Sequence, residues 1–158
     1  MATMVNGVYP VVIGGNISST DEIVSIWKGA SLPISDGITQ AHFPLGHHDE
    51  ENAEVEIIDP RCTFRERDGV ELLEHAGLER PTYEHALRFA EQWVIKQLGS
   101  AHEFRKPIIV FLHKPWKNPV GTPCVICVDR ETGQLFLGFA GYCTFSDHCD
   151  LAGVRPRK

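Results

Sequence analysis

The pattern of hydrophobic and polar positions in the first 60 residues predicts short elements separated by Gly and Pro. Residues 8–13 (VYPVVI) predict a strand, and Pro10, which has no N–H to donate to a neighbouring strand, places that strand at a sheet edge. Ser19 and Glu22 have the spacing of a capping box and predict the start of a short helix. Residues 54–58 alternate between charged and apolar side chains and predict a second strand.

The clearest periodicity predicts a helix that has Thr82 as its N-cap and runs to about Leu98. Its hydrophobic side chains recur every three or four positions, which places them on one face of the helix. These residues are Tyr83, Ala86, Leu87, Ala90, Trp93, Val94 and Leu98. So broad a face indicates a helix packed on a sheet rather than a narrow coiled-coil seam.

Apolar runs in the second half of the chain predict three more strands. The near-continuous run at 107–112 (PIIVFL) predicts a central or well-covered strand. Residues 124–128 and 135–139 predict a hairpin, in which Gly133 supplies the left-handed turn position. From Tyr142 onward the sequence is polar and ends in basic residues, which predicts a tail.

These elements predict an α+β fold in a single domain over residues 1–158, with an antiparallel sheet, one long amphipathic helix packed on it and a shorter N-terminal helix. The helix and hairpin of residues 82–140 form the expected core. A length of 158 residues is typical of one domain, and the chain contains no repeat, linker or low-complexity tract. Residues 30–52, punctuated by Pro and Gly, are expected to form a loop.

The charge of the chain is unevenly distributed. The formal net charge is -6, but residues 1–60 hold nine acidic side chains and one basic side chain, Lys28, whereas residues 61–158 are close to neutral. An acidic chain lacks the basic surface that binds nucleic acid or an anionic membrane, so neither is expected as a partner. No apolar run approaches the roughly 18–20 residues of a membrane span, and the N-terminus does not resemble a signal peptide. A cytoplasmic protein with free thiols is therefore expected.

Four of the five cysteines lie between residues 124 and 149, and this clustering indicates a candidate zinc site. Cys124 and Cys127 form a Cys-x-x-Cys pair whose thiolates can reach one metal ion, and Cys143 and His148 could complete a tetrahedral site across the hairpin. Against this, residues three apart in a strand face opposite sides of the sheet. The thiols then serve as small core hydrophobes without any cofactor, and both interpretations remain open.

The segment from Pro123 to Cys127 (PCVIC) also matches the second half of the zinc-deaminase signature, in which a His-x-Glu supplies the third ligand and the general acid/base. This gives an alternative function, a zinc-dependent deaminase-like hydrolase. Two features count against it. The candidate His-x-Glu, residues 48–50, lies far upstream in the predicted loop, and the residues after Cys127 predict a hairpin where the deaminase motif opens a helix.

The acidic run indicates a candidate protein-binding surface. Its carboxylates are Asp49, Glu50, Glu51 and Glu54. Such a cluster attracts a basic partner, speeds association and contributes to specificity, although it also fits a solvated loop. Trp27 and Trp116 are candidate aromatic anchors if their side chains are exposed, because Trp is favoured at interface hot spots.

From Thr82 to Ala140 the elements follow a particular order: a helix containing alanines, an apolar strand with an aromatic residue at 109–112 (IVFL), a loop with Gly, and a hairpin at 123–140 (PCVICVDRETGQLFLGFA). In this order, and in the VDRETG turn, the chain resembles the small immunity proteins of bacterial polymorphic toxin systems, particularly the YrhB-like group. The resemblance covers somewhat over a third of the chain. It implies a helix packed on a short antiparallel sheet, and it implies no catalytic residue.

The sequence therefore favours a binding protein over an enzyme. We expect a small acidic cytosolic protein of the immunity or inhibitor type, which neutralises a partner protein by steric and electrostatic occlusion. The expected partner is a basic toxin or enzyme, because the excess charge of this chain is negative. The zinc-dependent hydrolase is the alternative.

Overall fold

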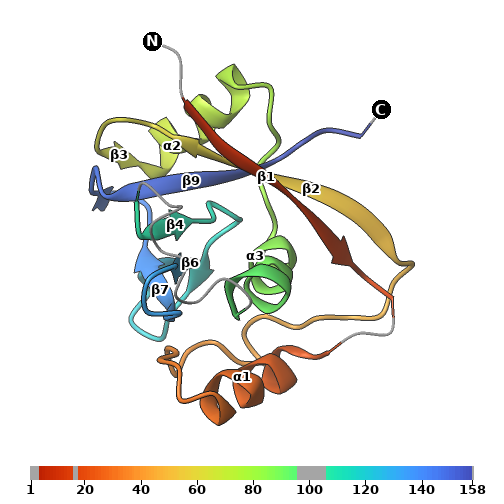
Figure 1. The fold of residues 1–158 in the computed structure, drawn as a ribbon. Helices are drawn as coiled ribbons and strands as arrows, with labels where there is room; N and C mark the ends of the chain where they lie inside the picture. The colour runs from red at the N-terminus through yellow and green to blue at the C-terminus, as the bar shows by residue number, and fades with distance from the viewer. Residues whose placement is uncertain (1–3, 16–17, 96–105, 158) are drawn as a thin grey trace.

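The computed structural model describes residues 4–15, 18–95 and 106–157, and within these ranges seven strands form one sheet (Figure 1). The strands of this sheet are β1 (Met4–Ile13), β2 (Glu51–Asp59), β4 (Ile108–Val110), β5 (Trp116–Lys117), β6 (Pro123–Asp129), β7 (Leu135–Phe139) and β9 (Cys149–Val154). Their order is β1-β2-β9-β4-β6, and β5 and β7 also pair with β6. Only β4 and β9 are parallel neighbours among these described strands.

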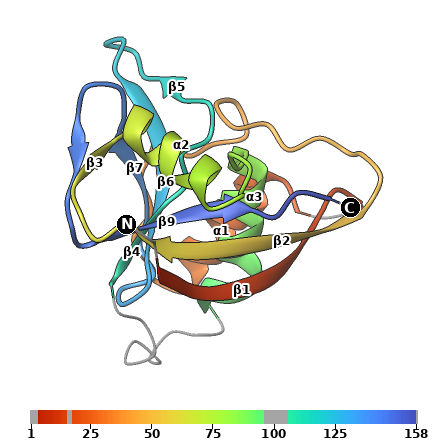
Figure 2. The same cartoon turned by 90° about the horizontal axis from the view of Figure 1, so that it is seen from above.

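Helices cover both faces of the sheet, as the view from the side of α2 shows (Figure 2). The elements on one face are α1 (Thr20–Gly29) and α3 (Tyr83–Phe89), which continues as the π-helix η1 (Ala90–Val94). The elements on the other face are α2 (Glu66–His75) and a small sheet of β3 (Phe64–Arg65) and β8 (Thr144–Phe145). The predicted α+β class is confirmed. None of the helices in the described ranges is both long and apolar enough to cross a membrane.

The hydrophobic core is divided in two by the sheet, because successive side chains of a strand point to opposite faces. The side chains that pack toward α1 and α3 include Ile57, Ile109 and Ile126. Those that pack toward α2 include Ile58, Val110 and Val125. This two-sided burial explains why β4 and β6 read as continuous apolar runs rather than as alternating ones.

Several local predictions are confirmed. β1 pairs only with β2 among the described strands and lies at the sheet edge, and Pro10 is exposed there. The Ser19 hydroxyl accepts the Glu22 N–H at 3.2 Å, and the Glu22 carboxylate accepts the Ser19 N–H at 3.2 Å, which completes the capping box of α1. β6 and β7 form the predicted hairpin, with Gly133 at a φ of 78°.

The long helix predicted from Thr82 to Leu98 is not confirmed. The structure has seven residues of α-helix in α3 followed by five residues of π-helix in η1, and Leu98 lies outside the described residues. Thr82 is the N-cap, as predicted. The predicted apolar face is oriented correctly, because its buried members Ala86, Leu87, Ala90 and Val94 pack against the sheet.

The prediction of a polar tail from Tyr142 is wrong. Thr144–Phe145 form β8, and β9 lies between β2 and β4 in the sheet, where its residues are all buried. The sequence of β9 (CDLAGV) did not predict a strand, because it contains a charged residue and two small residues. The Asp150 carboxylate is buried because it accepts a hydrogen bond from the Arg130 guanidinium at 2.5 Å. Gly153 allows α2 to approach, since a Cβ at this position would lie 2.7 Å from Leu73 Cδ2.

Candidate functional site

The two tryptophans predicted as anchors have opposite environments. Trp27 on α1 is fully buried, and its Nε1–H donates to the carbonyl oxygen of Gly133 at 2.7 Å, which fixes α1 to the hairpin turn. The prediction that it contacts a partner is wrong. The sequence did contain a signal that Trp27 is buried. Trp27 lies four residues after the buried Ile23, and residues at this spacing share one helix face. Trp116 on β5 is partly exposed and accessible to a partner.

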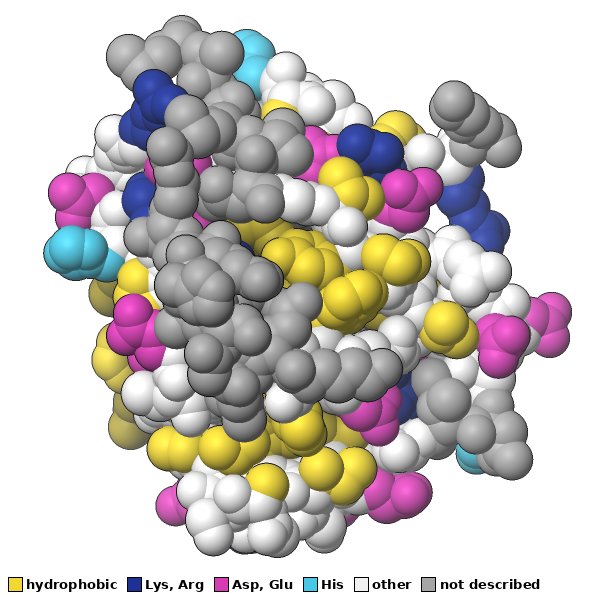
Figure 3. Space-filling view, in the orientation of Figure 1, with side chains coloured by type: hydrophobic (Ala, Val, Ile, Leu, Met, Phe, Trp, Pro, Cys, Tyr) yellow, Lys and Arg dark blue, Asp and Glu magenta, His cyan; other side chains and the backbone are white. Residues whose placement is uncertain are grey.

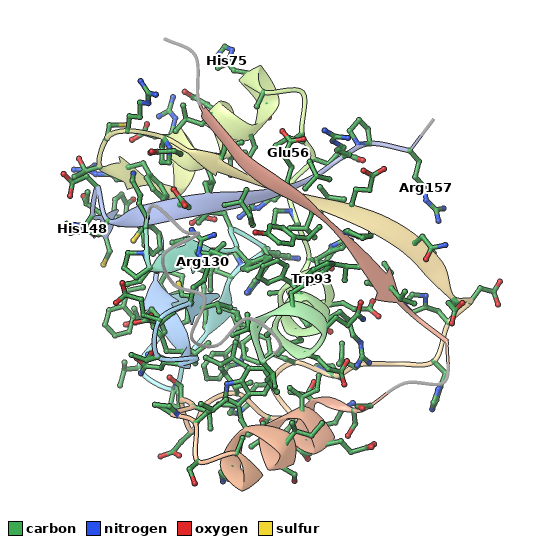
Figure 4. The ribbon with its side chains drawn as sticks, viewed as in Figure 1. Glu56, His75, Trp93, Arg130, His148 and Arg157 are labelled. Atoms are coloured by element: carbon green, nitrogen blue, oxygen red, sulfur yellow. The ribbon has the colours of Figure 1, made fainter. Side chains whose placement is uncertain are left out.

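The residues predicted as zinc ligands are not brought together. Cys124 and Cys127 are buried on β6, where their spacing places them on opposite faces, and burial raises the pKa of both thiols. Cys143 and His148 are exposed, and His148 lies at the start of β9 (Figure 4). In the ranges that the structure describes, no group of three or more His, Cys, Asp or Glu side chains is placed to hold a metal ion. Cys124 and Cys127 pack as buried side chains of the sheet.

The acidic edge, residues 49–54, is partly neutralised by arginines of the same chain. The segment that follows β9 lies along β2. The Arg155 N–H donates to the carbonyl oxygen of Glu54 at 3.0 Å, and Arg155 Nη1 lies 3.4 Å from the Glu54 carboxylate. Arg157 pairs with the Glu51 carboxylate at 3.4 Å and projects from the end of this segment (Figure 4). Two of the four predicted carboxylates are therefore already occupied.

The other two carboxylates of the acidic edge are less compensated. Asp49 and Glu50 are both exposed, and neither forms an ion pair within the described part of the chain. On the face that carries β1, acidic and basic side chains lie close to one another, and hydrophobic side chains gather in the middle (Figure 3). The acidic edge is thus a short negative segment, much smaller than the charge distribution of the sequence implies.

An open and mainly apolar concavity of about 440 Å³, which we name the aromatic hollow, surrounds Trp116. Trp116 stacks on His42 with ring centroids 4.3 Å apart. The buried ring of Phe43 packs beneath them, 5.7 Å from Trp116 and 5.5 Å from Tyr83. The other walls include Arg80, Pro81, His113, Lys114 and Pro115. Three segments that are distant in sequence thus contribute rings to one surface.

His113 fixes the wall of the aromatic hollow to the sheet. His113 lies in the segment between β4 and β5, and its ring is bonded to β6, because His113 Nε2 accepts the Ile126 N–H at 2.9 Å. Nδ1 lies 2.7 Å from the carbonyl oxygen of Lys114 and donates to it. A histidine that donates from one nitrogen and accepts at the other is neutral. Burial lowers the pKa of His113 to about 4, which keeps the ring uncharged at neutral pH.

Further hydrogen bonds hold the remaining walls. The Tyr83 hydroxyl donates to the carbonyl oxygen of Pro44 at 2.6 Å. Arg80 Nε donates to the carbonyl oxygen of Leu112 at 2.6 Å, and its Nη2 donates to the Glu66 carboxylate at 2.6 Å. Each wall is therefore tied to a neighbouring segment, and the concavity is formed before any ligand binds.

An ion pair links the aromatic hollow to the acidic edge. The Glu84 carboxylate lies 2.9 Å from His48 Nε2 and also accepts the Gly14 N–H at 3.0 Å. The hydrogen bond and the negative charge of Glu84 raise the pKa of His48. Tyr83, one residue earlier, lines the hollow, and His85, one residue later, lies beside the acidic edge in a second concavity of about 520 Å³. The two surfaces thus flank the first turn of α3.

The deaminase alternative needs His48 and Glu50 as parts of a His-x-Glu motif beside the cysteines. His48 instead contacts Glu84 on α3, and its Nδ1 donates to the carbonyl oxygen of Asp49 at 3.0 Å. The segment from Pro123 to Cys127 lies inside β6, which continues into the hairpin instead of opening a helix. The structure therefore does not place the parts of the deaminase signature in one site.

Sequence reasoning identified Trp116 but missed the rest of the aromatic hollow. His42 and Phe43 lie in the region interpreted as a loop, and Tyr83 was assigned to the core face of a helix. His113 gave no local signal, because its role depends on a hydrogen bond to a strand 13 residues away. These side chains meet only when the three segments fold together.

Comparisons of the chain with protein-family models, with curated proteins and with solved structures found no match. The resemblance of residues 82–140 to small immunity proteins stays a prediction.

Proposed function

We propose that this chain is a small cytoplasmic binding protein of the immunity or inhibitor type, which neutralises a partner protein by covering the surface that the partner needs for its activity. The aromatic hollow is the observation that carries this proposal. A partly exposed Trp116 is held by the His42 ring in an apolar concavity. Hot spots of protein interfaces have this composition, with an aromatic side chain in a preformed pocket and charged residues around it.

The arrangement of the two surfaces supports a division of roles in binding. The walls of the aromatic hollow are fixed by hydrogen bonds, so little conformational entropy is lost when a partner packs against them. Asp49 and Glu50 follow His48, which contacts Glu84 in the first turn of α3, and their exposed carboxylates attract a basic surface. We therefore assign affinity mainly to Trp116, and the rate of association mainly to Asp49 and Glu50.

The cysteines and the resemblance support the compartment and the class. All five cysteines are free, and Cys62 and Cys143 are exposed. Exposed free thiols persist in a reducing compartment, which agrees with the cytoplasm. The resemblance of residues 82–140 to immunity proteins supports inhibition of a partner, and this range includes Trp116 and Tyr83 of the aromatic hollow.

The proposal is tested by the stoichiometry of neutralisation. The partner is captured from the cells that produce this chain, purified by itself, and assayed for its own activity at increasing amounts of the chain. An occluding inhibitor acts by mass action, so we expect the activity to fall to near zero at about one equivalent. A partner that binds tightly and stays fully active would contradict the proposal. So would a loss of partner activity that progresses with time at a small fraction of one equivalent, because that behaviour belongs to an enzyme.

A further inference from the structure

The three tryptophans differ in what their indole N–H groups bind. Trp27 donates to the carbonyl oxygen of Gly133 at 2.7 Å, and Trp93 donates to that of Pro10 at 2.8 Å. The Trp116 Nε1–H has no acceptor among the residues that the structure describes. A ligand that covers Trp116 removes this N–H from water, and a buried indole N–H usually finds a hydrogen-bond acceptor. The donor is therefore available to a ligand of the aromatic hollow.

Two cationic side chains of the aromatic hollow also have donors to spare. Arg80 uses Nε and Nη2, whereas its Nη1 makes no hydrogen bond within the described ranges. Lys114 is exposed and has no ion-pair partner in that part of the chain. The Glu66 carboxylate, which pairs with Arg80, is engaged at both oxygens, by Arg80 at 2.6 Å and by the Gly141 N–H at 3.1 Å.

Some donors of the aromatic hollow are used within the chain and others are not. The Tyr83 hydroxyl, Arg80 Nε and His113 Nδ1 donate to the carbonyl oxygens of Pro44, Leu112 and Lys114. The donors that remain unused belong to an indole, a guanidinium and an ammonium group. Carboxylates are strong acceptors for all three and form charge-assisted hydrogen bonds with the two cations. The floor of the hollow consists of aromatic rings, against which an apolar planar group packs edge-to-face or by offset stacking.

We infer that the aromatic hollow binds a segment of the partner protein in which an aromatic side chain is flanked by carboxylates. The inference rests on the proposed function and adds the chemistry of the partner to it. The ring fills the space between Trp116, Phe43 and Tyr83, and the flanking carboxylates accept hydrogen bonds at the rim. A volume of about 440 Å³ is sufficient for such a side chain and lies within the usual range of ligand pockets, roughly 300–1,000 Å³.

The partner that fits this chain therefore carries two patches of opposite charge. A basic patch faces Asp49 and Glu50, and an acidic aromatic segment enters the hollow beyond the first turn of α3. Like charges meet if the partner is turned around, so the two patches together fix one orientation. An inhibitor that covers a defined surface needs such a fixed orientation.

The test uses a blocked pentapeptide, acetyl-Glu-Asp-Phe-Asp-Glu-amide, titrated into the ¹⁵N-labelled full chain and followed through the three indole N–H signals by NMR. We expect the Trp116 signal to shift in a saturable manner, while the signals of Trp27 and Trp93 stay in place. Peptides with Phe→Ala, or with all four acidic residues replaced by Lys, serve as controls, and each is expected to bind at least about tenfold more weakly, since an aromatic anchor or a charge pair contributes that much.

Lys114→Glu is the matched variant, and Lys117→Glu is its control, because Lys117 is also exposed but does not line the hollow. We expect Lys114→Glu to weaken the pentapeptide by about tenfold and Lys117→Glu by less than about twofold. Equal weakening by the two variants, or equal binding of the lysine peptide, would overturn the inference. Phenylacetate that binds as tightly as the pentapeptide would also overturn it, in favour of a small-molecule site.

Failure of this inference is distinguishable from failure of the proposed function. If the purified partner is neutralised at one equivalent but the pentapeptide leaves the Trp116 signal unchanged at millimolar concentration, the proposed function stands and the acidic aromatic chemistry is wrong. If the pentapeptide binds at Trp116 and the partner stays fully active in the complex, the hollow has the inferred chemistry and the inhibitor function is wrong.

Discussion

The aromatic hollow and the acidic edge lie on either side of the first turn of α3, and they differ in how far the chain satisfies its own polar groups. At the acidic edge, Arg155 and Arg157 of the same chain occupy Glu54 and Glu51. At the hollow, Trp116 and its cationic neighbours keep donors without acceptors among the described residues. The surface with unused hydrogen-bond donors, rather than the one with more charge in the sequence, is therefore the better candidate for binding.

The same comparison shows how each surface is held in place. The hollow is supported by His113, a buried side chain that accepts a hydrogen bond from β6, and by the ring of Phe43, which packs in the core. The acidic edge rests on ion pairs that are largely exposed, such as the Arg157–Glu51 pair, in which the arginine side chain is 70% exposed. Exposed pairs contribute little to stability, typically about 0–1 kcal/mol. We therefore expect changes at the hollow to have larger effects than changes at the edge.

The largest expected effect is the pH dependence that His113 gives to folding. Its pKa is about 4 in the folded chain and close to the ordinary value of about 6.5 in the unfolded chain, so the unfolded state binds the proton more tightly. This stabilisation is complete above about pH 6.5 and is lost as the pH falls toward 4, by up to about 3 kcal/mol. Urea unfolding at a series of pH values measures it.

The matched control for this prediction is an exposed histidine. His113→Gln removes the titrating group, and we expect the free energy of unfolding to depend less on pH over this interval. His75→Gln on α2 removes an exposed histidine and should leave the pH dependence of the wild type intact. An identical pH dependence in the wild type and in His113→Gln would show that the hollow does not rest on a neutral buried histidine.

Charge reversal at the acidic edge is expected to act on the rate of association. In the double variant Asp49→Lys/Glu50→Lys, the association rate constant with the purified partner should fall by about tenfold at low salt, with a much smaller change in the dissociation rate. Glu74→Lys on the exposed face of α2 is the control and should change the rate by less than about twofold. Stopped-flow measurements at two salt concentrations provide the test. A double variant that associates at the wild-type rate would remove the acidic edge from the interface.

The ion pair between the two surfaces is expected to appear in the titration of His48. The Glu84 carboxylate raises the pKa of His48, so any stability that the pair contributes is present below the unfolded pKa of about 6.5 and is lost as the pH rises through the folded pKa. NMR titration of the His48 ring should give a pKa above 6.5 in the wild type and a lower one in Glu84→Gln. Equal pKa values in both proteins would mean that the pair does not form in solution.

The smallest expected effect concerns the arginines that cover the acidic edge. Arg157→Ala frees the Glu51 carboxylate, so association with a basic patch should become about twofold faster at low salt. Arg67→Ala removes the same charge from the exposed face of α2 and is the control. If both variants accelerate association equally, the gain comes from net charge alone, and Arg157 does not screen the edge.

The local elements could be predicted from the sequence where one residue type determines one contact. The capping box at Ser19, the edge position of the strand that contains Pro10 and the hairpin turn at Gly133 each follow from a local signal, and all three are confirmed. β9 could not be predicted, because its buried Asp150 pairs with Arg130, which lies 20 residues earlier, and no local pattern reveals that pairing.

The candidate site was predictable only in part for a similar reason. A tryptophan is a reasonable anchor in any sequence, but the structure decides that Trp27 is buried against a hairpin turn and that Trp116 is open. The acidic run is visible in the sequence, whereas its pairing with arginines about 100 residues later is not. The aromatic hollow could not be predicted from the sequence, because its residues come from three separate segments, 42–43, 80–83 and 113–116.

In the proposed interface, Trp116 is the residue that anchors the partner. Isothermal titration calorimetry of the purified partner with the wild type, Trp116→Ala and Phe139→Ala tests this role, with circular dichroism to establish that each variant is folded. Phe139 is 55% exposed on β7 and controls for the loss of an exposed aromatic ring elsewhere. We expect Trp116→Ala to raise the dissociation constant by about 30-fold, equivalent to about 2 kcal/mol, and Phe139→Ala by less than about twofold. A folded Trp116→Ala variant that binds as tightly as the wild type would contradict the claim.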